Sequence, residues 1–258
     1  MACMPCPACG STHEVRPGII AWCGTCGHRW LKAPPTSRSG STEYLGCAGD
    51  LRFEIQAAAV ARDILIPRRP PPGRLLDGGC GAGDFLSIAN RMGYDAEGID
   101  VSDRAVDHCQ RRGLKAWRGD LADTNGDGPF DVITLWDVVE HLADPHAVLS
   151  GLASSLSDDG ILIAKVPTFG HLSPRLSAKM PRVSGALLGA PGHVQYFTPQ
   201  SLRRLVRRAG LHAEYLPRRN LRTQRSGGSL RRRLGRLAAR LIKTASQDGN
   251  MLVIASRT

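Results

Sequence analysis

Apolar residues form short runs that alternate with amphipathic stretches from about Gly73 to the end of this 258-residue chain. Short apolar runs are typical of strands, and apolar residues spaced three and four apart are typical of helices. Their alternation predicts an α/β fold with a mostly parallel sheet. The expected strands are Arg74–Gly78, Ala96–Asp100, Lys115–Arg118, Phe130–Leu135, Gly160–Val166, His212–Pro217 and Asn250–Ser256.

Helices are expected between these strands, and the last of them has the clearest signals. Thr198 is a suitable N-cap, Pro199 fits the first turn, and Gly210 fits the C-terminal end. Another helix, Leu51–Ile66, precedes the first strand and should pack beside the sheet. The expected helices within the alternating region are Asp84–Met92, Asp103–Arg112, Pro145–Ser155 and Thr198–Ala209.

The first 35 residues carry a different pattern, two Cys-x-x-Cys-Gly pairs separated by 13 residues. Four thiolates at this spacing can surround one tetrahedral zinc ion. Residues 1–35 are therefore predicted to form a zinc ribbon with a structural metal, and contact with a substrate or RNA is the alternative role. Cys3, His13 and His28 are the spare ligands; the expected ligands are Cys6, Cys9, Cys23 and Cys26.

Composition and charge complete this outline. Residues 36–50 read as a linker, which leaves residues 51–258 for one α/β domain. No apolar run has the length of a membrane span, and Met1 is not followed by a signal peptide. With eight cysteines, this favours metal binding in a reducing cytoplasm over disulfides. The expected location is cytoplasmic, with peripheral membrane contact as an option.

The turn after the first expected strand carries the most specific chemistry. Gly79, Gly81 and Gly83 form a G-x-G-x-G turn, and Asp77 precedes it. Such a turn lets the backbone approach a ligand closely and points N–H groups at it. A second apolar run ends at Asp100, about 20 residues later, where a ribose diol is usually bound. A dehydrogenase prefers G-x-G-x-x-G, in which the third glycine comes one residue later.

Four motifs together resemble the class I S-adenosyl-L-methionine (SAM) methyltransferases: D-x-G-x-G-x-G at 77–83, G-I-D at 98–100, G-D-L at 119–121 and F-D-V-I at 130–133. The resemblance implies a Rossmann-like seven-stranded methyltransferase sheet whose final strand runs antiparallel. It places the methionine part of SAM over Asp77–Gly83, the ribose on Asp100 and the adenine amino group near Asp120. Val101, Leu121 and Trp136 complete the implied cofactor site.

A second group of ionisable residues follows the fourth expected strand. Asp137, Glu140 and His141 have spacings that place them on one face of a helical turn. They suit a divalent cation such as Mg²⁺ or Mn²⁺, and equally a general base held by an acid. The run resembles the E-x-x-E-H motif of ubiquinone-pathway O-methyltransferases and small-RNA 2′-O-methyltransferases, with Asp137 replacing the first glutamate. His193 stands about where the RNA enzymes have a further histidine ligand.

Three interpretations of this group stay open at the level of sequence. The first is a divalent site formed by Asp137, Glu140, His141 and His193. The second is a catalytic or substrate-orienting role for Glu140, His141 or His193 without metal. In the third, Glu140 and His141 only fix the loop and the start of a helix.

Two long segments are expected to contribute to binding. Residues 167–191 contain no acidic residue and are predicted to form a lid over the reaction site. Between Glu214 and Asp248 there are nine arginines and one lysine without an acid, and the formal net charge of +11 would be +1 without them. Residues 218–249 are predicted to be a basic insertion in the last hairpin, with an amphipathic helix ending near Lys243. That helix could bind an anionic membrane surface or RNA phosphates, or pack on its own domain.

The predicted function is SAM-dependent methyl transfer. The order of zinc ribbon, linker and methyltransferase domain resembles bacterial methyltransferases of glycan, lipid and secondary-metabolite pathways. This favours O-methylation of a small-molecule, sugar or lipid-linked acceptor. The alternatives are an RNA methyltransferase that uses a divalent metal, and a SAM-binding scaffold without catalytic activity. The sequence does not determine the oligomeric state.

Overall fold

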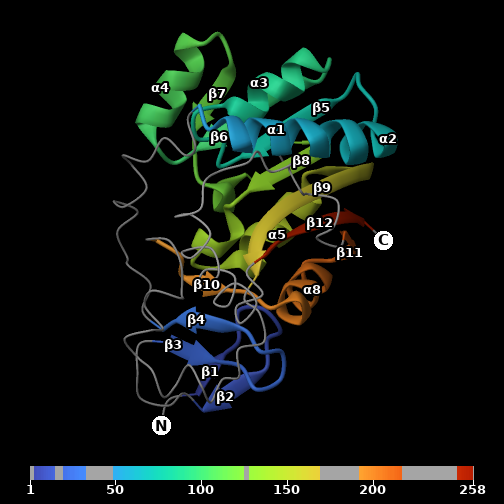
Figure 1. Cartoon of the computed structure of the whole chain (residues 1–258). Helices are drawn as coiled ribbons and strands as arrows, with labels where there is room; N and C mark the ends of the chain where they lie inside the picture. The colour runs from blue at the N-terminus through green and yellow to red at the C-terminus, as the bar shows by residue number, and fades with distance from the viewer. Residues whose placement is uncertain are drawn as a thin grey trace, which may run out of the picture.

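The computed structural model describes residues 3–14, 20–32, 49–124, 128–168, 192–216 and 249–257. Its central sheet has seven strands: β5 (Arg74–Gly78), β6 (Asp95–Asp100), β7 (Lys115–Arg118), β8 (Phe130–Trp136), β9 (Leu156–Thr168), β11 (Leu211–Leu216) and β12 (Gly249–Arg257). Their order is β11-β12-β9-β8-β5-β6-β7 (Figure 1). β12 runs antiparallel to both of its neighbours, β11 and β9, whereas the pairs that join β9, β8, β5, β6 and β7 are all parallel. The predicted sheet and its antiparallel last strand are confirmed.

Most strand boundaries lie within one residue of those expected from the sequence. β9 is the exception, since it begins four residues before Gly160 and ends two residues after Val166. It lies between β8 and β12 and pairs with both along its length. Pairing with these two neighbours therefore extends β9 beyond the apolar run from which the strand was predicted.

Helices cover both faces of the sheet, because successive residues of each strand point to opposite sides. Leu75 of β5 packs with α1 (Leu51–Val60) and α3 (Asp84–Arg91), whereas Leu76 packs on the other side. That second side is covered by α5 (Pro145–Ser154) and α8 (Pro199–Arg208). Figure 1 shows α1 and α3 above the strands and α8 below them. The expected helices are all present, with α4 (Asp103–Arg111) packed on β6 and β7.

The helix expected over Leu51–Ile66 is helical throughout but not uniformly α-helical. After α1, a π-helical turn covers Ala61–Leu65, and α2 (Ile66–Arg68) follows it. At the other end of the domain, α8 begins as expected. Thr198 and Ser201 bond reciprocally in a capping box, and Pro199 occupies the first turn.

The N-terminal module contains two small sheets (the blue strands in Figure 1). β1 (Cys3–Pro5) pairs with β2 (Thr12–Glu14). β3 (Ile20–Trp22) pairs with β4 (Arg29–Leu31), on either side of the second cysteine pair. β4 also pairs with β10 (Gln195–Tyr196), so one strand of this sheet comes from the region after β9. No pattern in the sequence indicated this pairing.

Several expectations concern residues outside the described ranges. Most of the linker at 36–50, most of the lid at 167–191 and nearly all of the basic insertion at 218–249 fall there. The boundaries of the zinc ribbon and the linker, and the basic helix with its RNA or membrane partner, stay predictions.

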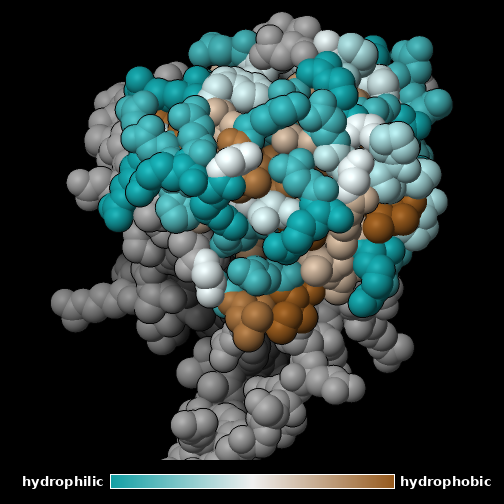
Figure 2. Space-filling model, turned by 90° about the horizontal axis from the view of Figure 1, so that it is seen from above, coloured by the Kyte–Doolittle hydropathy of each residue, from teal (hydrophilic) through white to brown (hydrophobic). Residues whose placement is uncertain are grey.

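The surface seen from above is mainly hydrophilic, with a few small apolar areas (Figure 2). Large apolar side chains that are well exposed include Leu51 and Ile55 of α1. Among the residues that the structure describes, no helix combines the length and apolar character needed to cross a membrane.

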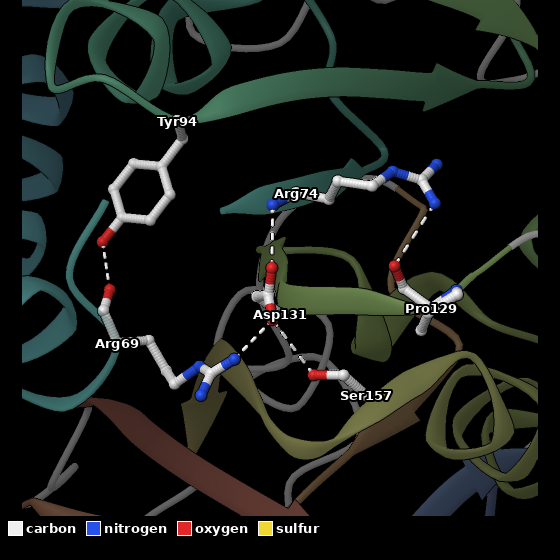
Figure 3. A network of polar contacts seen from close by, with 6 residues as sticks. All are labelled: Arg69, Arg74, Tyr94, Pro129, Asp131 and Ser157. Carbon is white, nitrogen blue, oxygen red and sulfur yellow. Dashed lines mark hydrogen bonds and ion pairs between the residues drawn. The ribbon is translucent and has the colours of Figure 1, made fainter. Parts of the chain in front are cut away.

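A polar network closes the sheet at the amino end of β8 (Figure 3). The Asp131 carboxylate accepts hydrogen bonds from the Arg74 amide (3.0 Å), the Ser157 hydroxyl (3.2 Å) and the Arg69 guanidinium. Arg74 also donates to the Pro129 carbonyl at 3.3 Å. This edge is thus held by groups that satisfy one another.

Candidate functional site

The glycine turn lies at the carboxyl ends of the parallel strands, the edge at which α/β sheets bind their ligands. Gly79, Gly81 and Gly83 have φ angles of 67°, 52° and 77°. Side chains disfavour this left-handed region, so the turn depends on glycine. A Cβ at Gly79 would also lie 2.6 Å from the Val138 side chain. Val138 belongs to the segment after β8, which therefore contacts the glycine turn directly.

Two aspartates lie next to this turn, and one of them bonds it. Asp77 is buried at the end of β5, and its carboxylate accepts a hydrogen bond of 2.7 Å from the Thr134 hydroxyl. Burial raises the pKa of Asp77 to about 7. Asp100, at the end of β6, accepts from the amides of Gly81 and Ser102, both at 2.9 Å. Its carboxylate thus lies beside the turn, and its binding of a ribose stays a prediction.

The remaining residues of the predicted cofactor site are distributed around the same edge. Asp120 caps the short 3₁₀ helix η3 (Leu121–Asp123) by accepting from the Ala122 amide at 3.0 Å. Leu121 reaches toward β5, and a Cβ on Gly78 would lie 2.9 Å from it. Trp136 packs its ring against Phe85, with centroids 4.9 Å apart. Its buried indole N–H has no hydrogen-bond partner among the described residues. Val101 follows Asp100 directly and is partly buried.

Glu140 is the most unusual carboxylate in the described chain. It lies in the 3₁₀ helix η4 (Val139–His141) and is 1% exposed, yet neither carboxylate oxygen has a hydrogen-bond partner in the described part of the chain. Burial raises the pKa of Glu140 to about 8; Asp137 adds to this rise and Lys165 opposes it. A buried carboxylate without partners is costly, so it calls for a cation, a proton or a ligand.

Two histidines face Glu140. The Nε2 atom of His193 lies 3.9 Å from a Glu140 oxygen, and the rings of His141 and His193 meet edge to face at 4.7 Å. His141 Nδ1 is 3.0 Å from the Gly192 carbonyl. A carbonyl only accepts, so Nδ1 is the donor, and in the neutral imidazole the lone pair is then on Nε2. Burial lowers the pKa of His193, which keeps that imidazole neutral near pH 7.

The fourth predicted ligand, Asp137, has a different partner. Its carboxylate is 2.5 Å from the Lys165 ammonium, and its amide donates to the Lys165 carbonyl at 3.0 Å. Donor atoms of Glu140, His141 and His193 all lie within 4.8 Å of one another, and this group does not include Asp137. The structure thus brings three of the four residues together and pairs the fourth with a lysine.

The four predicted zinc ligands converge at the other end of the molecule. Their sulfur atoms lie within 4.8 Å of one another, with Cys6–Cys26 and Cys9–Cys23 separations of 3.7 and 3.6 Å. A tetrahedral site with Zn–S bonds of about 2.3 Å has sulfur atoms about 3.8 Å apart. The donor set therefore fits one zinc ion. His28, a spare candidate, hydrogen-bonds Gln195 instead.

Some residues of this region were missed by the sequence analysis. Lys165 is 7% exposed, and its ammonium lies 5.9 Å from the centre of the Phe53 ring. A lysine inside the apolar run Ile161–Val166 was a signal that could have been used, because buried lysines are rare unless paired. Phe53 of α1 also contacts Trp136 edge to face at 5.7 Å.

A sheet of this order, with a glycine turn after its first strand and a carboxylate ending its second, defines a class I SAM-dependent methyltransferase. The family model described as "Methyltransferase domain" matches residues 51–216, more than half of the chain. The chain belongs to this family, as its motifs predicted, and it is a SAM-dependent methyltransferase.

Curated relatives carry a more specific name. The chain is 29% identical over 216 residues to the ubiquinone biosynthesis O-methyltransferase of Methylococcus capsulatus, covering 78% of this chain and 84% of that protein. It is 32% identical over 178 residues to the protein of the same name from Cereibacter sphaeroides, covering 64% and 70%.

Solved structures agree with the fold. A complex of the Trm112 methyltransferase activator with a methyltransferase from Haloferax volcanii matches with a TM-score of 0.57 and 19% identity, covering 83% of this chain and 97% of that chain. A SAM-dependent methyltransferase from Archaeoglobus fulgidus matches with a TM-score of 0.53 and 18% identity, covering 79% and 94%.

Proposed function

We propose that this protein transfers the methyl group of SAM to a hydroxyl oxygen of its acceptor, with Glu140, His141 and His193 as the residues that handle the hydroxyl proton. The observation that carries this proposal is the pair of buried Glu140 oxygens without hydrogen-bond partners in the described chain, facing two imidazoles. The O-methyltransferase name of the curated relatives supports oxygen as the acceptor atom.

The cofactor residues are proposed as the motifs predicted them. Amides of the turn at Gly79, Gly81 and Gly83 would hold the methionine part, and Asp100 the ribose diol. Asp120 would accept from the adenine amino group, with Val101, Leu121 and Trp136 around the adenosyl part. When bound, SAM supplies an electrophilic methyl group on a positively charged sulfur. Because Val138 contacts Gly79, the segment that carries Glu140 lies beside the cofactor turn.

The residues after β8 and around β10 can remove a proton. A neutral imidazole is a suitable general base near pH 7, and burial keeps His193 in this form. Its Nε2 faces Glu140, whose raised pKa keeps the carboxyl protonated near pH 7. An imidazolium that forms when the acceptor proton arrives would favour the ionised carboxylate beside it, and the two charges would stabilise each other. The same two groups could orient the hydroxyl before it reacts.

The same donor atoms fit a divalent cation. One carboxylate and two imidazoles, one of them with Nδ1 bonded to a carbonyl, is a donor set seen in metal sites. Two nitrogen donors suit Mn²⁺ or a similar transition ion better than Mg²⁺, which prefers oxygen. A bound cation would lower the pKa of the acceptor hydroxyl. With a cation bound, Glu140, His141 and His193 are its proposed ligands and His193 no longer serves as the base, because its lone pair is then coordinated; Asp137 stays paired with Lys165.

We also propose one zinc ion at Cys6, Cys9, Cys23 and Cys26. The sulfur separations match a tetrahedral tetrathiolate site, and three of the four cysteines are fully buried. The predicted role is structural, because four protein thiolates leave no open position.

The acceptor class can be tested with the full-length protein, labelled SAM and four groups of acceptors: phenols and catechols, free sugars, lipid-linked saccharides, and RNA. We expect an added methyl group on oxygen in one of the first three groups, with the atom identified by NMR. Activity should fall when weakly bound divalent ions are removed and should return with Mn²⁺.

Other results would contradict this proposal in distinct ways. Transfer only to amines or thiols would exclude the oxygen assignment. Methylation of RNA with a steep dependence on salt would favour the RNA enzyme instead. Tight SAM binding with no transfer to any acceptor group would count against Glu140 and the two histidines as a reaction site.

A further inference from the structure

The N-terminal module and the methyltransferase domain share a sheet. Strand β4 pairs with β10 through Trp30–Gln195 and Arg29–Tyr196, and the Leu31 amide donates to the Val194 carbonyl at 3.0 Å. In Figure 1, β10 lies directly above β4. The module is therefore joined to the domain by backbone hydrogen bonds as well as by side-chain packing.

The segment that forms β10 also carries part of the proposed reaction site. The Val194 amide donates to the Glu140 carbonyl at 2.9 Å, and the Tyr196 hydroxyl donates to the His193 carbonyl at 3.0 Å. Val194 thus bonds the module through its carbonyl and η4 through its amide. His193 precedes it directly, so the path of β10 determines where that imidazole lies relative to Glu140.

A buried pair of side chains makes a second link. The Gln195 amide nitrogen donates to the carbonyls of Leu142 and Ala143, at 3.1 and 3.3 Å. Its oxygen is 2.9 Å from His28 Nε2. Because the amide nitrogen is already committed, Nε2 of His28 must be the donor. His28 is fully buried and Gln195 is 3% exposed, so water is not an alternative partner for either bond.

The second cysteine pair holds His28 in place. Gly27, with a φ of 72°, turns the chain between Cys26 and His28. The Cys26 carbonyl accepts from the Thr198 hydroxyl at 3.0 Å. The His28 ring packs on Phe197, with centroids 4.7 Å apart. Any change in the order of this cysteine turn is therefore transmitted to the His28 imidazole.

We propose that His28 and Gln195 are positioning residues, through which the four-cysteine module fixes the loop of Glu140 and His141 opposite His193. The assignment rests on the proposed function of that cluster. The bonded path runs from the Cys26 turn to His28, to Gln195, and on to the carbonyls of Leu142 and Ala143. The N-terminal module is then part of the support of the reaction site, not a separate attachment.

The test compares His28→Phe, Gln195→Leu and Gln195→Glu in the full-length, metal-loaded protein. Phenylalanine keeps the packing on Phe197 but removes the donor. Glutamate still accepts from His28 but cannot donate to Leu142 and Ala143. The matched control is Arg208→Gln, which removes another contact between the same two parts, the bond of 3.0 Å to the Pro7 carbonyl, without touching the path.

Two readouts do not depend on methyl transfer. Hydrogen–deuterium exchange of the amides of residues 139–143 should become at least about tenfold faster in all three variants. Affinity for Mn²⁺, followed by electron paramagnetic resonance, should fall about 10- to 100-fold, as supporting residues around metal ligands typically contribute. Metal content of the cysteine site and SAM affinity should stay within about threefold of the unaltered protein, and Arg208→Gln should change none of these.

Turnover then tests the consequence for the reaction. With whichever acceptor proves active, kcat should fall about 10- to 100-fold while the acceptor KM changes little.

Unchanged exchange at residues 139–143 in Gln195→Leu and Gln195→Glu would overturn the positioning role even if methyl transfer is established. An equal effect of Arg208→Gln would also overturn it, because docking alone would then explain the loss. If His28→Phe does not fold, Gln195→Glu decides, since it keeps the bond from His28. If hydrogen exchange at residues 139–143 becomes faster but no acceptor is methylated, the positioning role of His28 and Gln195 is supported and the proposed function is contradicted.

Discussion

Two carboxylates flank strand β8, and their surroundings are opposite. Asp131, at the amino end, accepts hydrogen bonds from Arg69, Arg74 and Ser157 (Figure 3). Glu140, after the carboxyl end, is more deeply buried and has no partner for either oxygen among the described residues. The same strand thus begins at a carboxylate whose hydrogen bonds are satisfied and leads to one whose oxygens have no such partners.

Their pKa values shift in opposite directions for this reason. Burial acts to raise the pKa of Asp131, but hydrogen bonds from the Arg74 amide, the Arg69 guanidinium and Ser157 outweigh it and hold the pKa below its usual value. At Glu140 burial prevails and raises the pKa to about 8. The fold thus provides hydrogen bonds for Asp131 at one edge of the sheet and none for Glu140 at the other. A buried carboxylate without partners destabilises the folded state, and such local destabilisation is expected where a protein binds a ligand.

Replacing the ionisable carboxyl of Glu140 by an amide tests this contrast most strongly. Glu140→Gln keeps the shape of the side chain, so SAM affinity should stay within about threefold, while turnover should fall about 100- to 10,000-fold because proton removal loses its acid–base partner. Steady-state kinetics and calorimetry measure the two effects. Asp131→Asn serves as the control and should keep turnover per folded molecule. Equal losses in both variants would show that the two edges do not differ in function.

Much of the site edge was predictable because its signals are local. A glycine turn after a strand, with an aspartate before it, dictates a backbone shape wherever it occurs, and Gly79, Gly81 and Gly83 adopt that shape. The convergence of Cys6, Cys9, Cys23 and Cys26 followed from spacing in the same way. Strand and helix positions came from periodicity, which also acts over a few residues.

The unpredicted parts depend on residues that are distant in sequence. His28 and Gln195 are 167 positions apart, and no pattern in either neighbourhood indicates that they meet. Asp137 was a candidate ligand in one of the three interpretations left open, because of its spacing to Glu140 and His141. Its carboxylate is instead beside Lys165, because β8 and β9 are neighbours in the sheet. Spacing along a helical turn cannot reveal a competitor on another strand.

The pH dependence of stability is the next largest expected difference between Glu140 and Asp131. In the unfolded chain Glu140 ionises near 4.5, the ordinary pKa of a glutamate, whereas in the folded chain it stays protonated up to about 8. Its raised pKa therefore gives stability that is complete below the unfolded value and is lost as pH rises through this window, by at most about 1.4 kcal/mol per pH unit.

Chemical denaturation at several pH values, without added divalent ion, should show this loss. In Glu140→Gln the part of the decline that belongs to Glu140 should be absent, so the variant gains on the unaltered protein as pH rises. The part that comes from Asp77, whose pKa is also raised by burial, should remain in both proteins. A stability difference between the two proteins that is the same at both ends of the window would mean that Glu140 is ionised in the folded state. Its lack of partners would then be no sign of a site.

Asp131→Asn should give the smallest effect, with the opposite dependence on pH. Because its pKa is lowered in the folded state, the Asp131 carboxylate stabilises the fold above its unfolded pKa, and this contribution is lost as pH falls through the folded value. The side chain is about one-third exposed, so solvent weakens the pair with Arg69. We expect a loss of stability of about 1–2 kcal/mol at pH 7, which shrinks on acidification.

Ser157→Ala, which removes one of the three donors, is the matched variant and should lose less stability. If the loss of stability in Asp131→Asn stays the same in acid, it comes from a packing defect. The network around Asp131 would then be held together by side-chain packing and not by the charge of its carboxylate.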